Sequence, residues 1–394
     1  MGNMQPSNRT SRGWAKSALF ASLLTSIAIG SGGTIEAQTT RKPATAKSLP
    51  GKSATEAGPR FKAIWEPVNV KEDLQLMSVY FATADEGWVA GGGSGSGGGV
   101  IVHTKDGGAN WDVQLGDPQS SDRPYHQLRF VNARVGFAAQ STASGDHQLL
   151  RTTDGQTWAP VGKLAQHRSD YRFISAEAGL LAGGGGIQRT QDAGRTWKQV
   201  YVCRIKAEIN GLTQDVGCHI AQVAFVDANV AYAMSQSIGA GAGFVMAKTM
   251  DGGTTWSSWL VLPGEEGSEG ALHFLDANTG VLRTINGKVF RTIDGGKTWT
   301  GVTGIIGGKP AIGFADAEVG WMMAYRLMLY TTNGGKSWVS REIPFPASVN
   351  AFSLVKRDRG YAVGEHGMVY RYRIVPADYS SKGMLAAPAM NSSR

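Results

Sequence analysis

The chain has 394 residues, including 54 glycines and 11 tryptophans, and its formal net charge is +8. A hydrophobic content of 42% is too high for a disordered chain, and two cysteines are too few for a disulfide scaffold or a four-thiolate zinc site. Glycine and tryptophan enrichment favours many short strands joined by tight turns.

Residues 1–37 are predicted to be a signal peptide. Arg9, Arg12 and Lys16 precede a short apolar stretch from Ser17 to Gly30, and cleavage is expected after Ala37. The stretch is shorter than the ~20 residues that a membrane-spanning helix needs. No twin-arginine pair is present, so we expect export by the general secretory route, to the periplasm or the outside of the cell.

The segments on either side of the central region are predicted to be disordered. Residues 38–60 form a linker rich in Ala, Lys, Pro, Ser and Thr, and residues 376–394 form a similar C-terminal tail. Neither segment has enough apolar side chains to order itself by burial. The remaining domain is therefore expected to span residues 61–375.

One short motif, Thr-x-Asp-Gly-Gly-x-x-Trp, recurs six times within this domain. The second copy is one residue shorter, and the sixth has Asn in place of Asp. The tryptophans follow one another at intervals of 39 to 59 residues, the spacing of four-stranded propeller blades. The central acidic or amide residues of the six copies are Asp106, Asp154, Asp192, Asp251, Asp294 and Asn333.

A second motif lies upstream of each copy. It runs from a phenylalanine through a turn to a glycine or alanine that is followed by an aromatic or aliphatic residue, as in Phe81 to Trp88. A seventh version, Leu354 to Tyr361, has no downstream partner. Phe61 to Val68 resembles the strand that follows each motif tryptophan. We therefore predict that it forms the outer strand of a seventh blade, whose inner strands come from residues 351–375, and so closes the ring.

The repeated motif is predicted to be structural. Its glycines suit positive φ in a turn, its carboxylate can accept nearby backbone N–H groups, and its tryptophan can bury a large face. Each copy offers at most one carboxylate, too few ligands for calcium. The seven histidines show no metal-ligand spacing. We therefore expect no metal and no cofactor.

These residues match the Asp-box, or BNR repeat. Across residues 61–375 the chain resembles the photosystem II stability/assembly factor-like family of seven-bladed propellers. The resemblance implies an exported, non-enzymatic protein that binds a protein partner and assists assembly or stabilisation of a membrane protein complex. In photosynthetic members, an arginine-rich face is implicated in contacting the client.

An enzymatic function is the alternative, because Asp-boxes also occur in sialidases and other glycoside hydrolases. The Arg-Ile-Pro signature of sialidases is absent, and the nearest string is Arg341 to Pro344. The clustered Glu265, Glu266 and Glu269 lie in a Gly/Ser-rich loop, which is typical of a solvated surface. A surface module that binds carbohydrate without turnover is a third possibility.

Cys203 and Cys218 lie 15 residues apart within an insert, Tyr201 to Ile220, assigned to the fourth blade. In an exported protein, two cysteines this close are expected to form a disulfide across the base of the insert.

Most of the positive charge lies outside the predicted propeller: residues 1–60 carry a net +6, and residues 61–394 carry +2. This removes the main support for nucleic-acid binding, and we expect membrane contact only through a partner. Residues 121–206 nevertheless carry a net +6, which predicts a basic flank on the second and third blades. The candidate partner-binding residues of an expected monomer are Arg123, Arg129, Arg134, Arg151, Arg168, Arg172 and Arg189.

Overall fold

The computed structural model describes residues 61–379, apart from the segments 94–97, 121–122, 142–146, 165–169, 210, 239–240, 266–269 and 305–310. The chain divides into two units, residues 1–57 and 58–394, and every described residue belongs to the second. The predicted signal peptide and linker therefore lie outside the described residues. In the described part of the chain, no helix is long and apolar enough to span a membrane.

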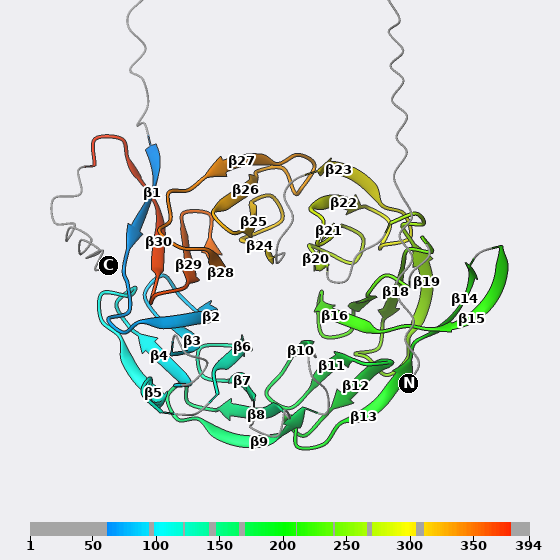
Figure 1. Cartoon of the computed structure of the whole chain (residues 1–394), viewed down its shortest axis with the longest axis horizontal. Helices are drawn as coiled ribbons and strands as arrows, with labels where there is room; N and C mark the ends of the chain where they lie inside the picture. Colours follow the sequence, from blue (N-terminus) through cyan, green and yellow to red (C-terminus); the bar gives the residue numbers. More distant parts are fainter. Residues whose placement is uncertain are drawn as a thin grey trace, which may run out of the picture. The chain divides into compact units, whose positions relative to one another are not determined.

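Every regular element among the described residues is a β-strand, and seven four-stranded antiparallel sheets form the blades of a ring (Figure 1). The first three blades are β2 (Leu74–Phe81), β3 (Gly87–Gly93), β4 (Val100–Thr104) and β5 (Asp112–Gly116); β6 (Tyr125–Phe130), β7 (Gly136–Ser141), β8 (His147–Thr152) and β9 (Ala159–Leu164); and β10 (Asp170–Phe173), β11 (Gly179–Gly183), β12 (Gly186–Thr190) and β13 (Lys198–Val202).

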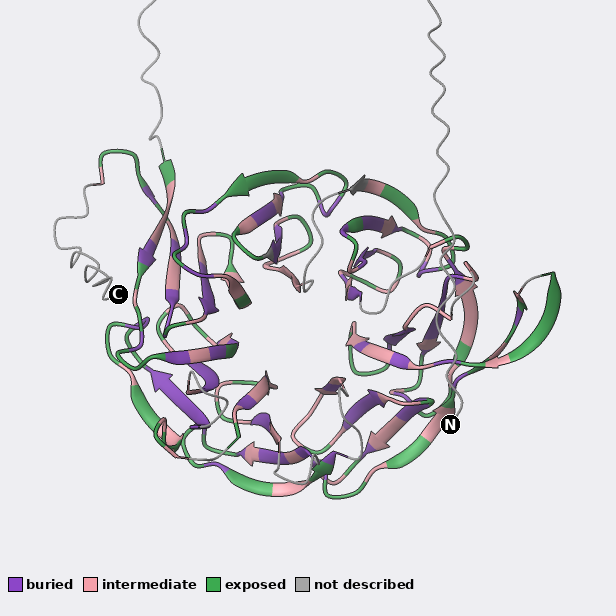
Figure 2. Ribbon diagram, in the orientation of Figure 1, coloured by how far each residue is buried: buried purple, intermediate pink, exposed green. Residues whose placement is uncertain are grey.

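The next three blades repeat this order, with the first strand innermost and the fourth strand at the rim (Figure 1). They are β16 (Ile220–Phe225), β17 (Ala231–Ser235), β18 (Phe244–Thr249) and β19 (Ser257–Val261); β20 (Ala271–Phe274), β21 (Gly280–Arg283), β22 (Lys288–Thr292) and β23 (Thr300–Gly304); and β24 (Ala311–Phe314), β25 (Gly320–Ala324), β26 (Leu327–Thr331) and β27 (Val339–Glu342). The burial colours follow the same order, with exposed residues concentrated along the rim strands (Figure 2).

The seventh blade joins the two ends of the described chain. It comprises β28 (Val349–Lys356), β29 (Arg359–Gly364), β30 (Val369–Pro376) and, at the rim, β1 (Phe61–Pro67). β1 pairs antiparallel with β30 from Phe61↔Pro376 to Pro67↔Tyr370. The predicted all-β, seven-bladed propeller closed by an N-terminal strand is thus confirmed.

A buried acidic residue strengthens this closure. The Glu66 carboxylate, on β1, accepts hydrogen bonds from the guanidinium groups of Arg371 (3.1 Å) and Arg373 (3.2 Å) on β30, and from the Tyr379 hydroxyl (3.3 Å). Ordered packing therefore continues to Tyr379, four residues past the expected boundary at 375. The reason is that the Tyr379 hydroxyl supplies one of the hydrogen bonds that the buried Glu66 carboxylate needs.

The upstream motif sets where the first strand of each blade ends and the second begins. Phe81 ends β2 and Gly87 opens β3 directly opposite it. A β-carbon on Gly87 would fall on the Phe81 ring, so this position excludes every larger residue. Gly136, Gly179, Gly280 and Gly320 face the phenylalanines of their own blades in the same way.

A row of three residues on one face of each sheet contacts the next blade. It consists of the residue before the first-strand Phe or Leu, its partner on the second strand and that residue's partner on the third. We call this the inter-blade row. In chain order the rows are Tyr80–Trp88–His103, Arg129–Phe137–Arg151, Arg172–Leu180–Arg189, Ala224–Tyr232–Lys248, His273–Val281–Arg291, Gly313–Trp321–Tyr330 and Ser353–Tyr361–Arg371.

In most blades, the middle residue of the row packs on the phenylalanine that ends the first strand of the next blade; the seventh blade has Leu354 at this position. Phe137 stacks on Phe173 with ring centroids 3.5 Å apart, and Tyr232 stacks on Phe274 at 3.6 Å. Tyr361 stacks on Phe81 at 3.4 Å and so joins the last blade to the first. The same stacking therefore operates both between sequential blades and at the point of closure.

Two predicted boundaries change. The insert begins after β13 and ends before β16, so Tyr201 and Ile220 belong to blades rather than to the insert. It forms a hairpin of β14 (Arg204–Ile209) and β15 (Leu212–Gly217) between the third and fourth blades. The motif tryptophans lie one residue before the rim strands instead of beginning them. Five of the six rings meet the phenylalanine of their own blade, as Trp111 meets Phe81 at 6.4 Å.

Truncation of Phe81 to alanine is expected to lower the free energy of unfolding by about 3–5 kcal/mol, because the side chain is buried between Tyr361 and Trp111. Chemical denaturation measures this value. The matched control is Phe61→Ala, whose side chain is 61% exposed, and which should change stability by less than about 0.5 kcal/mol. Equal effects of the two variants would contradict the closure described here.

Candidate functional site

The Asp-box carboxylates hold their own turns. The Thr104 hydroxyl donates to Asp106 Oδ1 (2.9 Å) and accepts the Gly108 N–H (2.9 Å), while Asp106 Oδ1 accepts the Asn110 N–H (2.8 Å). The threonine, aspartate and second glycine are thereby locked together. Asp192, Asp251 and Asp294 have the same arrangement with the N–H and hydroxyl groups of Thr196, Thr255 and Thr298.

The two atypical copies keep the turn by different means. In the shortened second copy, the Thr152 hydroxyl accepts the Gly155 N–H at 3.0 Å, one residue earlier than in the other copies. In the sixth copy, Asn333 Oδ1 accepts the Ser337 N–H (3.0 Å), and its amide donates to the Ser337 hydroxyl (2.8 Å). An amide therefore replaces the carboxylate without loss of the turn.

These hydrogen bonds stabilise the charged form of each carboxylate. The hydroxyl and N–H of Thr196 lower the pKa of Asp192 to about 2, and the N–H and hydroxyl of Thr255 lower that of Asp251 to about 2. Both pKa values lie far below the range expected of a general acid near neutrality. The Asp-boxes therefore serve the fold.

Four of the seven candidate arginines lie in two adjacent inter-blade rows. Arg129 and Arg151 flank Phe137 on the face of the second blade that packs against the third, and Arg172 and Arg189 flank Leu180 on the face of the third that packs against the fourth. None of the other five rows contains more than one arginine. We call these four residues the double-arginine rows.

The other three candidates are placed differently. Arg134 is exposed in the turn between β6 and β7. Arg123 is exposed in the link before β6, at the opposite end of that strand. Arg168 lies outside the described residues. The structure thus brings Arg129 and Arg172 together at Asp170 and places Arg151 and Arg189 in the same two rows.

The double-arginine rows carry one acidic residue that sequence reasoning missed. Asp170 opens β10 and lies 3.3 Å from Arg129 and 3.5 Å from Arg172, and it also accepts the Val223 N–H at 3.2 Å. It therefore bridges the innermost strands of three blades. Two of its partners, Arg129 and Val223, lie 41 and 53 positions away in the sequence, so the chain order did not mark Asp170 as a bridge between blades.

Two of these arginines retain donors without acceptors. Nε of Arg129 and Arg151 is buried and has no hydrogen-bond partner among the described residues, whereas Nε of Arg172 forms the 3.5 Å ion pair with Asp170. The side chains of Arg129 and Arg172 are 27% and 41% exposed. The Nε of Arg189 also has a partner within the fold, since it donates to the Gly252 carbonyl of the next blade at 2.9 Å.

The positive field of the rows extends to the fifth blade. Burial, together with the charge of Arg172, lowers the pKa of His273 to about 4, and its ring stacks on Phe314 at 5.0 Å. His273 is therefore neutral at physiological pH and does not add to the field. Among the described residues, Asp170 is the one carboxylate that pairs with any of these four guanidinium groups, which leaves a partly desolvated cationic site suited to carboxylate or other anionic groups.

The described residues show neither a metal centre nor a pair of free carboxylates in the glutamate cluster. No group of three or more His, Cys, Asp and Glu side chains within the described ranges could hold a metal ion. Glu265 is bound by Lys288 at 2.7 Å, and Glu266 and Glu269 lie outside the described residues. Cys203 and Cys218 are joined by a disulfide with Cα atoms 5.3 Å apart.

Acidification is expected to destabilise the propeller through its Asp-boxes. Because Asp192 and Asp251 titrate at about 2 when folded but near ~3.9 when unfolded, the unfolded state binds more protons in this window. The stabilisation is complete above the unfolded pKa and is lost as the pH falls towards 2. Denaturant midpoints across this range should fall, and Asp251→Asn should flatten part of the slope. An unchanged slope would contradict this account.

Comparisons with known proteins agree with this geometry. Residues 59–223 match the family model of the photosynthesis system II assembly factor YCF48, whereas a search of curated proteins found no match. A solved structure of YCF48 bound to D1 peptide is 16% identical, with a TM-score of 0.58 over 78% of this chain and 96% of that chain. YCF48 from Cyanidioschyzon merolae is 17% identical, with a TM-score of 0.56 over 78% and 98%. These two likenesses show the shared fold, and the family match shows that residues 59–223 are similar to the photosystem II assembly factor family.

Proposed function

We propose that this chain is an exported, non-enzymatic propeller that binds an anionic segment of a protein partner and assists assembly or stabilisation of a membrane protein complex. The observation that carries the proposal is the pair of double-arginine rows. Among the described residues, these guanidinium groups form ion pairs with one carboxylate, that of Asp170, and the side chains of Arg129 and Arg172 are 27% and 41% exposed. A partner that supplies carboxylates would pair with the exposed parts of these guanidinium groups and balance their charge.

A similar structure indicates which class of ligand could bind at these arginines. YCF48 has been solved with a D1 peptide bound, so a propeller of this fold can hold a peptide. For this chain we propose a peptide segment with acidic groups, read by Arg129, Arg134 and Arg172. Arg151 and Arg189 support them by fixing the faces on which they lie, through the Phe137 ring and the Gly252 carbonyl respectively.

A binding role also accounts for the acidic residues better than glycoside hydrolysis does. A glycosidase needs two carboxyl groups facing each other across the bond that is cleaved. Asp192, Asp251 and Asp294 are instead engaged by their own turns, and Asp170 is held between two arginines. These contacts support a non-enzymatic role, and a glycoside panel with purified protein tests it directly.

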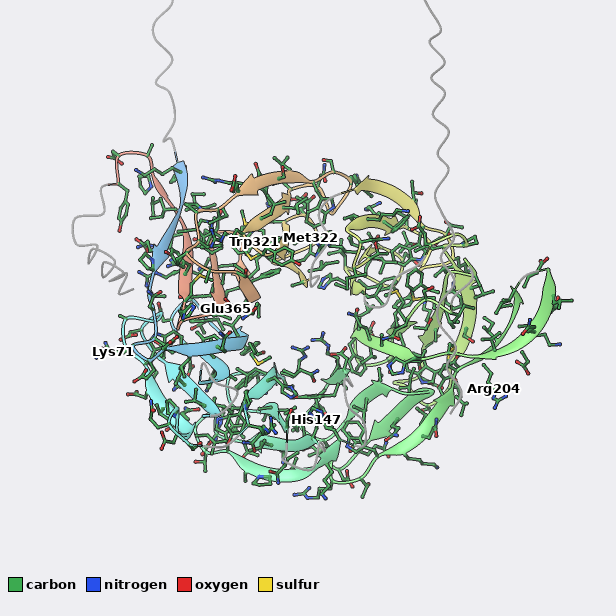
Figure 3. All side chains as sticks on the ribbon, in the orientation of Figure 1. Lys71, His147, Arg204, Trp321, Met322 and Glu365 are labelled. Carbon is green, nitrogen blue, oxygen red and sulfur yellow. A yellow bond between two sulfur atoms is a disulfide. The ribbon has the colours of Figure 1, made fainter. Side chains whose placement is uncertain are left out.

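Charge reversal at the accessible arginines is expected to abolish peptide capture. The double variant Arg134→Glu/Arg172→Glu should weaken binding of a fluorescent D1 peptide at least about tenfold, because two attractive charges become repulsive. Fluorescence anisotropy measures the affinity. The control is Arg204→Glu, an equally charge-reversed arginine at the start of the hairpin, which Figure 3 places at the outer rim of the ring. If both proteins bind the peptide as the wild type does, the proposed site is wrong.

Export is expected to leave a mature protein that begins at Gln38. The disulfide between Cys203 and Cys218 supports an oxidising compartment. Mass spectrometry of the protein from the periplasmic or extracellular fraction should give an N-terminus after Ala37, and changing Ala37 to a bulky residue should retain the precursor. Recovery of the full-length chain from the cytoplasm alone would count against export.

A further inference from the structure

The hairpin β14–β15 is an addition to the repeat and projects from the ring beside the third and fourth blades (Figure 1). Its base is firmly held: the disulfide joins Cys203 to Cys218, and the Cys218 N–H donates to the Cys203 carbonyl at 3.2 Å. The N–H groups of Cys203 and Ile220 donate to the carbonyls of Gly185 and Gly184, at 2.7 and 3.1 Å. The hairpin is therefore a preorganised element.

The two faces of the hairpin differ in character. On one face, Ile205 pairs with Val216 and Ile209 pairs with Leu212, whereas the other face carries the pairs Lys206↔Asp215 and Glu208↔Thr213. The base of the apolar face packs on the core beside the disulfide, where Ile205 lies against the buried cysteines. Towards the tip this face becomes solvent-exposed, and Leu212 is 65% exposed.

The outer edge of β15 is free to accept another strand. Only two residues separate Ile209 from Leu212, so this closing pair of the hairpin is hydrogen-bonded. Hydrogen-bonded and non-hydrogen-bonded pairs alternate along an antiparallel ladder. The backbone N–H and C=O groups of Thr213 and Asp215 therefore point away from β14. No described residue bonds to these outward groups. β15 has no Pro, no Lys and no register shift, and Asp215 is its one charged residue.

We propose that this edge pairs with the same edge of a second copy of the chain, antiparallel about a two-fold axis at Gln214. Residues directly opposite each other in a sheet must lie on the same face. The axis at Gln214 meets this rule and places Leu212 opposite Val216 of the second copy, on the apolar face. It also places the outward-facing Thr213 opposite Asp215 of the second copy, where about four backbone hydrogen bonds form.

The neighbouring registers are less favourable. An axis at Asp215 would set two carboxylates opposite each other, which is destabilising. An axis at Thr213 shortens the overlap and places Leu212 opposite Gln214 instead of an apolar residue. The chemistry of β15 therefore selects one self-complementary pairing, which gives an isologous dimer with a four-stranded sheet at its centre.

The dimer formed in this way is weak. Two hairpins bury less surface than the ~1,200 Å² of a stable interface, so association is transient and depends on concentration. The proposal replaces the expected monomer with a monomer–dimer equilibrium. At high local concentration it would present two propellers, and hence two pairs of double-arginine rows, to one partner complex.

Crosslinking through the axis tests the register. Under mild oxidation, Gln214→Cys in the full chain should give a reducible dimer, because residues on the axis lie within the Cα distance that a disulfide spans. Peptide mapping should find Cys203–Cys218 intact and a new bond between the two introduced cysteines. The control is Glu208→Cys, which is also exposed but lies on β14 and should stay monomeric.

Blocking the edge tests the interface itself. Thr213→Pro removes an N–H that points away from β14, so the hairpin should remain intact while pairing with a second copy is lost. Sedimentation equilibrium at hundreds of micromolar should show dimerisation of the wild type and none of the variant, and equal thermal midpoints should show that both are folded. A wild type that stays monomeric and does not crosslink would overturn the proposal, as would a dimer unaffected by Thr213→Pro.

Discussion

The contact between each inter-blade row and the phenylalanine of the next blade is the interaction on which the ring depends. A four-stranded blade exposes two faces and cannot bury both alone, so its stability requires neighbours on each side. The stacking of Phe137 on Phe173, Tyr232 on Phe274 and Tyr361 on Phe81 meets that requirement with one geometry. The glycine that opens each second strand is part of it, since its missing side chain makes room for the phenylalanine ring of its own blade.

This packing explains why the basic residues of the second and third blades have two roles. The row places Arg151 and Arg189 beside the next blade, where Arg189 donates to the first glycine of the following Asp-box. Arg291 and Arg371 make the equivalent contact with Gly334 and Gly107. The fold therefore needs only one basic residue in a row. The second arginine in each of the two double-arginine rows goes beyond that need, and this excess makes the site a candidate for binding.

The hairpin β14–β15 departs from the repeat in its structure and in its chemistry. Blade residues are constrained on both faces by their neighbours, whereas the hairpin is held only at its base, by the disulfide and a few backbone hydrogen bonds. Consequently, Ile205 and Ala207 are the apolar residues of the hairpin that are packed or buried within the fold. An edge strand that the ring neither pairs nor covers is the part of this molecule most open to association with another chain.

The sequence by itself determined the blade number, the strand order and the closure of the ring. Glycine, phenylalanine and tryptophan recur at fixed spacings within the motifs, and the packing of these residues sets where the strands of each blade begin and end. It also pointed to the paired cysteines, which are close along the chain. The roles of individual arginines were decided only by the tertiary structure. Arg129 meets Asp170, and Asp170 meets Val223, across separations of 41 and 53 residues, and charge counted along the chain cannot distinguish a guanidinium packed between blades from one that faces solvent.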